Sequence, residues 1–442
     1  MSSKFFKDLE VYTAKRFKDS VSSSNVYLTF GRVVAWPNEN NPTEATTSDD
    51  ATYPSWKYMI GGKKINGSDI RHVVPRHNWT NNTVYYAYSS RVNSTDLKNP
   101  NTAMYVITDE FNVYKCIANN YGKASTQKPT STNPASVFQT ADQYTWKYMY
   151  TLTGEEQLRF TTSSFIPVKT LLSDDNSLQW QVQQDAVFGA INSILISSGG
   201  SGTGYTSNSI SVNIKGDGSF ANAYAVRNVI TSNIQSIVVD TKGSGYTYAN
   251  VSITSSHGSG ANAYVVIDPP GGHGSDALHE LGGSYLMINV KLDGTEEGKL
   301  LVKNDYRQIH ILENPLVYGD TNVASNLVFS QLTVLSLGSG LTATDYSLDE
   351  TVYQGSDLAN ATYKGVVADW DSANSLLKLT NVEGTPTSQL IIGNTSTTSR
   401  YVSSVSDPDL QPYSGYILYK DNIVAIERAE DQSEDFKIVL SF

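Results

Sequence analysis

INSILISSGGSGTGYTSNSISVNIKGDGSFANAYAV (191–226) is repeated with changes as IQSIVVDTKGSGYTYANVSITSSHGSGANAYVV (234–266). Each copy reads as an Ile/Val strand, a Gly-Tyr-Thr turn, a second strand, a glycine turn and an Ala-Asn-Ala-Tyr strand. A period of roughly 40 residues indicates a duplicated supersecondary unit. Because such glycine- and alanine-rich copies bury few large side chains, we expect them to pack together as one β-unit.

The composition of the whole chain also favours β-structure. Of its 442 residues 39% are hydrophobic, 11% aromatic and only 17% charged, with 28 Tyr and 32 Gly. Aromatic and β-branched residues favour strands, and runs of helix-forming residues are scarce. We therefore predict a mainly β protein, with a layered β-sandwich body, a few short helices and two inserted small β-modules, each a sandwich or a barrel.

Breaks in the sequence pattern divide the chain into body and modules. Pro269-Pro270-Gly271-Gly272 ends the repeats with rigid and then flexible residues. After residue 336, short strand-like runs are separated by Gly, Asp and Asn turns. The predicted parts, in chain order, are the body segment 1–182, the repeat module 183–283, the body segment 284–335, a second module 336–404 and the body segment 405–442.

Charge and hydropathy exclude several classes of partner. The formal net charge of −11 argues against a nucleic-acid or an anionic membrane partner. No window approaches 18 apolar residues, and the first 17 residues lack the apolar core of a signal peptide. We expect synthesis in a cytoplasm and no contact with membrane. The single cysteine, Cys116, is predicted to be a small buried residue on a strand.

Residues that could carry chemistry are few. The Gly-Ser-Gly-Tyr-Thr turns lack the Lys-Ser/Thr of a phosphate loop, so we expect no nucleotide cofactor. The loop GGHGSDALHELGG (271–283) holds the best metal candidates, His273, Asp276, His279 and Glu280. Asp276 is equally suited to cap a short helix over 277–281. No spacing of acids or Ser/His/Asp order indicates an active site, so we assign no catalytic, cofactor or metal residue.

Six short motifs lie outside the two modules. In chain order they are VYLTFGR (26–32) followed by Trp36, VVPRHNW (73–79), VYKC (113–116), YTWKYM (144–149), YRQIHILENPL (306–316) and SGYILYKDN (414–422). Together they resemble the baseplate wedge subunit of contractile-tailed, T-even-like phages, the subunit numbered eight there. The resemblance covers the three body segments, whereas the two modules depart from it and are interpreted as insertions.

The resemblance implies a structural, non-enzymatic protein of the virion tail baseplate, made in the host cytoplasm. It further implies a homodimer that docks on neighbouring wedge subunits around the tail hub. Candidate interface residues are the ring and arginine side chains of the motifs, namely Arg32, Trp36, Arg76, Trp79, Trp146 and Arg307. For each of them, core packing or a strand-end salt bridge is the competing interpretation. Two other classes stay open, a virion-borne glycan-binding adhesin and a polysaccharide depolymerase, suggested by the aromatic side chains and acids of the β-rich chain.

Overall fold

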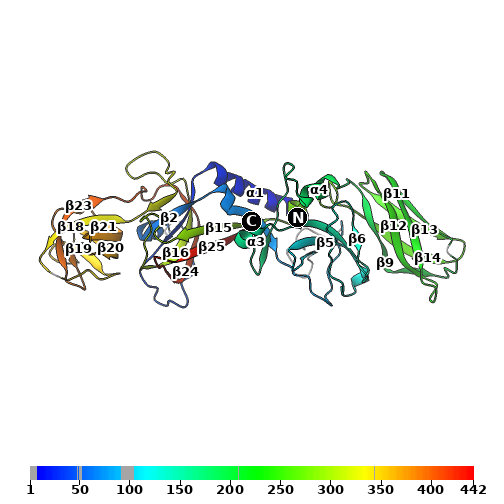
Figure 1. Cartoon of the computed structure of the whole chain (residues 1–442), viewed down its shortest axis with the longest axis horizontal. Helices are drawn as coiled ribbons and strands as arrows, with labels where there is room; N and C mark the ends of the chain where they lie inside the picture. Colours follow the sequence, from blue (N-terminus) through cyan, green and yellow to red (C-terminus); the bar gives the residue numbers. More distant parts are fainter. Residues whose placement is uncertain (1–6, 47, 49–51, 91–103, 208, 343) are drawn as a thin grey trace. The chain divides into compact units, whose positions relative to one another are not determined.

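The computed structural model describes residues 7–46, 48, 52–90, 104–207, 209–342 and 344–442. It contains two compact units, one formed by Met1–Arg16, Arg71–Met287 and Val439–Phe442, the other by Phe17–Ile70 and Ile288–Ile438. The boundaries fall within α1 (Lys7–Ser23), β3 (Ile70–Pro75), β15 (Tyr285–Asp293) and β25 (Ser433–Ser441). Strands predominate in both units (Figure 1), so the predicted mainly β fold with a few short helices is confirmed. None of the helices in the described ranges is long and apolar enough to cross a membrane.

The body of the first unit is built on a four-stranded sheet with the order β4-β5-β7-β6. Its strands are β4 (Tyr105–Ile107), β5 (Asn112–Asn119), β6 (Phe138–Gln139) and β7 (Tyr144–Thr151), with β8 (Phe165–Pro167) pairing with β3 nearby in the sequence. Three short helices accompany them: α3 (Gly154–Phe160), α4 (Leu178–Gln184) and α5 (Ala277–Glu280). Thr153 and Glu156 form a capping box that fixes the start of α3.

Both faces of this sheet are buried, which explains its continuous runs of apolar residues. One face contributes Val113 and Met149 to one core cluster, and the other contributes Tyr114, Cys116 and Trp146 to a second. A sheet covered on both sides is the middle layer of a sandwich. Cys116 is fully buried on β5, as predicted.

The repeats fold as one module of six strands, and each copy pairs with the other rather than with itself. The first copy supplies β9 (Ile191–Thr203), β10 (Ile210–Gly216) and β11 (Ser219–Arg227), and the second supplies β12 (Ile234–Ser244), β13 (Ala249–Ser255) and β14 (Ser259–Ile267). Antiparallel pairs form between β9 and β14, β10 and β13, and β11 and β12. Side chains of both copies share one core cluster, which confirms the prediction of a single β-unit.

Two buried tyrosines show how closely the copies correspond. The hydroxyl of Tyr205 in the first copy accepts from the backbone N–H of Ala261 in the second at 3.3 Å. The hydroxyl of Tyr246 accepts from the N–H of Ala221 at the same 3.3 Å. Glycine is required beside these rings, since a Cβ on Gly218 would lie 2.4 Å from the ring of Tyr246. The Gly-Tyr-Thr turns therefore provide the central side chains of the module core.

The second unit contains a five-stranded sheet with the order β17-β2-β1-β16-β24. Its strands are β1 (Val26–Gly31), β2 (Met59–Ile65), β16 (Asp305–Glu313), β17 (Val328–Ser330) and β24 (Tyr416–Glu427), and α2 (Thr52–Tyr58) directly precedes β2. Two glycines let β2 pack closely, because a Cβ on Gly62 would lie 2.6 Å from the carbonyl oxygen of Leu28. All residues of β1 are buried, as expected for a central strand.

A closed six-stranded barrel forms the rest of this unit. Its strands are β18 (Thr333–Gly340), β19 (Thr351–Gln354), β20 (Tyr363–Asp371), β21 (Leu376–Gly384), β22 (Leu390–Gly393) and β23 (Ser399–Ser406), in the order β18-β21-β20-β19-β22-β23. The sequence left a sandwich or a barrel open, and the fold is a barrel filled by side chains such as Leu335, Val352 and Ile391. Its strands run from 333 to 406, close to the predicted 336–404.

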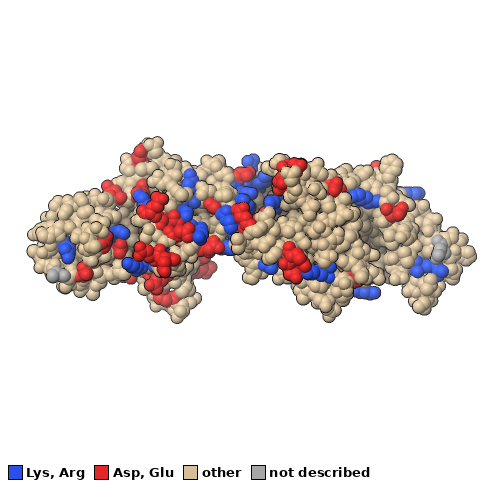
Figure 2. Space-filling model, viewed as in Figure 1, with Lys and Arg blue, Asp and Glu red and all other residues tan. Residues whose placement is uncertain are grey.

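The charged side chains are spread thinly over the surface. On the face shown in Figure 2, acidic and basic groups lie among a majority of other residues and form no single basic area. This distribution matches the low fraction of charged residues, 17%.

Candidate assembly sites

Three of the six candidate interface residues meet in the second unit. The guanidinium of Arg32 lies 3.8 Å from the centroid of the Trp36 ring. Arg307 donates from Nη1 and Nη2 to both carboxylate oxygens of Asp305, each at 2.7 Å, and from Nε to Glu39 at 2.8 Å. Glu39 also accepts from the backbone N–H of Trp36 at 2.7 Å. The turn after β1 is thereby tied to β16 by charge-assisted hydrogen bonds.

The local chain geometry places Arg32 for this contact. Arg32 follows the last residue of β1 and has a left-handed φ of 59°. Its backbone N–H donates to the carbonyl of Tyr58 at 2.8 Å, so the strand pairing ends there. A Cβ on Gly31 would lie 2.3 Å from that same carbonyl oxygen, so only glycine allows the close approach.

Burial makes this cluster a structural one within the chain. Arg307 and Trp36 are only 6% and 8% exposed, and Trp36 Nε1 donates to the carbonyl of Ile423 on β24 at 3.1 Å. Burial opposes the charge of Arg307, but the bonds to Asp305 and Glu39 outweigh it, and the pKa of Arg307 is raised. Loss of one partner would leave a buried charge without compensation. The interface role of these residues stays a prediction.

The other three candidates lie in the first unit and differ in exposure. Trp146 is fully buried and stacks on Tyr144 with ring centroids 5.5 Å apart. Trp79 is partly buried against the same core cluster. Arg76 is half-buried, and its Nη1 donates to the carbonyl of Thr162 at 3.1 Å. The competing interpretation, core packing, describes the position of Trp146, whereas Arg76 and Trp79 retain exposed surface.

The barrel is attached to the rest of the second unit by hydrogen bonds and an ion pair. Asn304 Nδ2 donates to the carbonyl of Ala368 at 2.5 Å, next to β16. Lys57 in α2 pairs with Glu383 of β21 at 2.9 Å, and its carbonyl accepts from Thr380 at 3.1 Å. Sequence reasoning missed these contacts, since no motif marks a polar residue whose partner lies hundreds of positions away.

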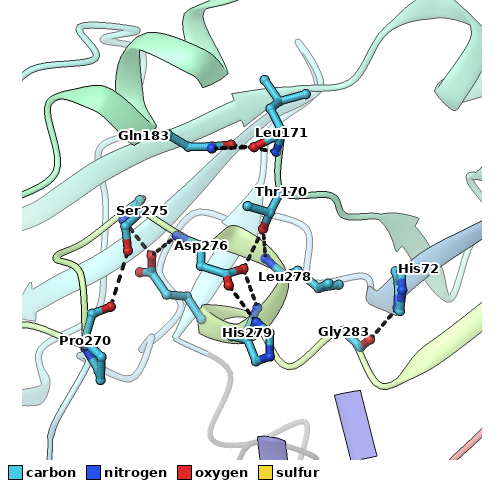
Figure 3. A network of polar contacts seen from close by, with 12 residues as sticks. His72, Thr170, Leu171, Gln183, Pro270, Ser275, Asp276, Leu278, His279 and Gly283 are labelled. Atoms are coloured by element: carbon cyan, nitrogen blue, oxygen red, sulfur yellow. Dashed lines mark hydrogen bonds and ion pairs between the residues drawn. The ribbon is translucent and has the colours of Figure 1, made fainter. Parts of the chain in front are cut away.

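The loop with the metal candidates separates them into two pairs. Asp276 is the N-cap of α5, and its carboxylate accepts from the backbone N–H of His279 at 3.1 Å. Figure 3 shows Asp276 facing both Thr170 and the ring of His279, whose Nδ1 lies 2.7 Å from the carboxylate. Burial opposes the charge, and the bonds from His279 and Thr170 outweigh it, lowering the pKa of Asp276 to about 2. The helix-capping interpretation of Asp276 is thus confirmed.

The second pair, His273 and Glu280, belongs to a buried charge cluster with Lys115 and Asp268. Lys115 Nζ lies 2.6 Å from Glu280 Oε2, His273 Nε2 lies 3.3 Å from Asp268, and His273 Nδ1 lies 3.6 Å from Glu280. None of these side chains is more than 3% exposed. The ammonium of Lys115 supplies the cation that a metal would otherwise provide. In the described part of the chain, no three His, Cys, Asp or Glu side chains are grouped to hold a metal ion.

This cluster connects the repeat module to the body of the first unit. Asp268 directly follows β14, and its carboxylate accepts from Asn192 of β9 at 2.5 Å. Lys115 comes from β5 and Glu280 from α5. Burial and the nearby Lys115 lower the pKa of His273, so its ring is neutral at pH 7. Sequence reasoning found His273 and Glu280 but missed Lys115 and Asp268, whose neighbours in sequence give no sign of the contact.

The comparison with known families bears on the N-terminal part of the chain. Residues 7–120 match the family model described as Bacteriophage T4, Gp8. The matched segment runs from α1 to β5 and contains Arg32, Trp36, Arg76 and Trp79. No curated protein matches the chain. The match over residues 7–120 identifies the chain as similar to the phage T4 Gp8 family and supports its identification as a baseplate wedge subunit.

Proposed function

We propose that this chain is a structural subunit of a contractile phage tail baseplate, where it joins neighbouring wedge proteins around the hub. The observation that carries the proposal is the family match over residues 7–120, which includes two of the motif segments with interface candidates. The working unit is a homodimer, made in the host cytoplasm and incorporated into the virion tail. We assign it no catalytic step and no cofactor.

An exposed group of tyrosines in the second unit supports a role in protein assembly. Tyr53, Tyr413 and Tyr416 are 59%, 50% and 72% exposed, and the rings of Tyr53 and Tyr413 lie 5.3 Å apart. Trp56 lies behind them, with its ring centroid 6.5 Å from that of Tyr413. Aromatic side chains are enriched in the central parts of protein interfaces. This tyrosine patch is our candidate for contact with a wedge neighbour.

Two measurements test the proposal. Size-exclusion chromatography with light scattering gives the mass of the purified chain, for which we expect a dimer. Mixing with the other wedge proteins of the same phage should give a larger complex, and Tyr413→Ser with Tyr416→Ser should weaken it. Tyr401→Ser, which alters a 46% exposed tyrosine on the barrel, is the matched control. A chain that stays monomeric and joins no wedge protein would contradict the proposal.

A further inference from the structure

The duplication makes the β9–β14 and β11–β12 sheets equivalent, yet their outer faces differ in exposure. In the β9–β14 sheet, the outward pair Tyr264 and Leu195 is half-buried. In the β11–β12 sheet, the corresponding pair Tyr224 and Val238 is 51% and 38% exposed. The module thus has one largely covered face and one open face built on the same plan.

Phe220, at the start of the open face, is unusual when compared with its counterpart in the second copy. The counterpart is Gly260, whose φ is +81°, and Phe220 has a φ of +67°. Side chains other than glycine rarely adopt this left-handed conformation. The ring of Phe220 is also 85% exposed, so burial within the chain does not offset the backbone cost. Strained residues of this kind are characteristic of binding sites.

Three side chains of β11 form a stripe on the open face. Phe220, Asn222 and Tyr224 alternate with alanines that face the module core. Asn222 Nδ2 lies 3.5 Å from a carboxylate oxygen of Asp240 on β12, so the carboxylate lies on the same face. Four residues of a strand span about 13 Å. Two rings therefore flank an amide and a carboxylate along one line.

The size of the open face limits the kind of partner it fits. Five residues of a two-stranded sheet cover only about 170 Å². A stable protein interface needs about 800 Å² on each partner, so a protein would have to contact much more than this face. A linear chain of sugars needs only a narrow strip of this kind.

The chemistry of the stripe favours an uncharged sugar chain. Aromatic rings provide apolar surfaces for the C–H faces of sugars, while the amide donates and the carboxylate accepts hydrogen bonds from hydroxyl groups. Among Phe220, Asn222, Tyr224 and Asp240 the only charge is negative, so a polyanionic glycan would be repelled. We propose that the outer face of the β11–β12 sheet binds an extended, uncharged polysaccharide. This activity goes beyond the structural role and is carried by a different part of the chain.

Affinity electrophoresis of the full chain tests the proposal. Native gels that contain dextran, mannan or galactan should retard the protein in at least one case. Phe220→Gly and Tyr224→Ala should each weaken the retardation about tenfold, the effect of losing one stacked ring. Tyr401→Ala on the barrel should leave it unchanged. Absence of retardation in all three gels, or retardation that survives both substitutions in the stripe, would overturn the proposal.

Thermal unfolding separates a binding role of Phe220 from a structural one. Phe220→Gly introduces the residue found at the equivalent position, so we expect Tm to stay the same or rise while binding weakens. A lower Tm with unchanged binding would mean that Phe220 serves only the fold, and would overturn the assignment. Assembly with wedge proteins is measured separately, so its failure and the failure of polysaccharide binding are distinguishable.

Discussion

Removing Lys115 is the most informative perturbation of the buried charge cluster. Lys115→Met keeps the apolar stem but leaves Glu280 without its ammonium partner, which lies 2.6 Å from the carboxylate. The only other donor to Glu280 at short range in the described structure is the backbone N–H of Gly274, at 2.7 Å. Breaking a buried ion pair of this kind costs about 3–5 kcal/mol of folding free energy.

The pKa of Glu280 gives an independent magnitude. Burial opposes ionisation, but Lys115 and His273 outweigh it, so the pKa falls from 4.5 to about 2. A lowered carboxyl pKa adds stability that is present above pH 4.5 and is lost as the pH falls toward 2. At about 1.4 kcal/mol for each pKa unit, the contribution is about 3 kcal/mol at neutral pH. Both routes therefore give a similar loss for the variant.

Calorimetric unfolding of the full chain measures the effect. For a unit of this size a loss of 3–5 kcal/mol lowers Tm by about 6–20 °C, and only the transition of the unit that contains Lys115 should move. The double variant Lys115→Met, Glu280→Gln should recover most of the loss, because it removes both charges. A loss below about 1 kcal/mol in the single variant, or no recovery in the double variant, would refute the reasoning.

Three further predictions concern other buried groups. Arg307→Gln should cost about 3 kcal/mol or more, measured by urea unfolding, since it leaves Asp305 and Glu39 without their cation; an unchanged midpoint would contradict this. Gly62→Ala should cost about 1–3 kcal/mol, because its Cβ would lie 2.6 Å from a carbonyl oxygen; Gly154→Ala, with nothing within 4 Å, is the control. Cys116 should react with a thiol reagent only after unfolding, since burial raises its pKa and removes it from solvent; rapid labelling of the native chain would exclude this.

The elements of the fold could be predicted from the sequence more fully than their pairing. Local patterns indicate the strands of the repeats, because glycine turns and alternating residues are properties of neighbouring positions. Pairing between the copies, such as β10 with β13, depends on contacts that no local pattern records. The choice between sandwich and barrel for residues 333–406 likewise depends on closure between β18 and β23.

The candidate site shows the same limit at the level of side chains. Arg307 was selected from its motif, but its partner Glu39 lies 268 positions earlier, in a loop that no motif marks. Trp146 was selected for its ring, and its position in the core depends on the layers that cover both faces of β7. A motif identifies a residue that matters, whereas only the fold shows which group it contacts.

The cross-pairing of the repeats also explains why the buried charges lie at their base. Because β9 opens the module and pairs with β14, which closes it, the two ends of the module lie side by side. Asn192 and Asp268 sit at these ends, and Asp268 continues the contact to His273 and the body. Both ends are therefore fixed at one place, so the six strands form one unit with a single attachment to the body. A duplicated sequence alone would suggest two units in a row, and the pairing of its first strand with its last excludes that arrangement.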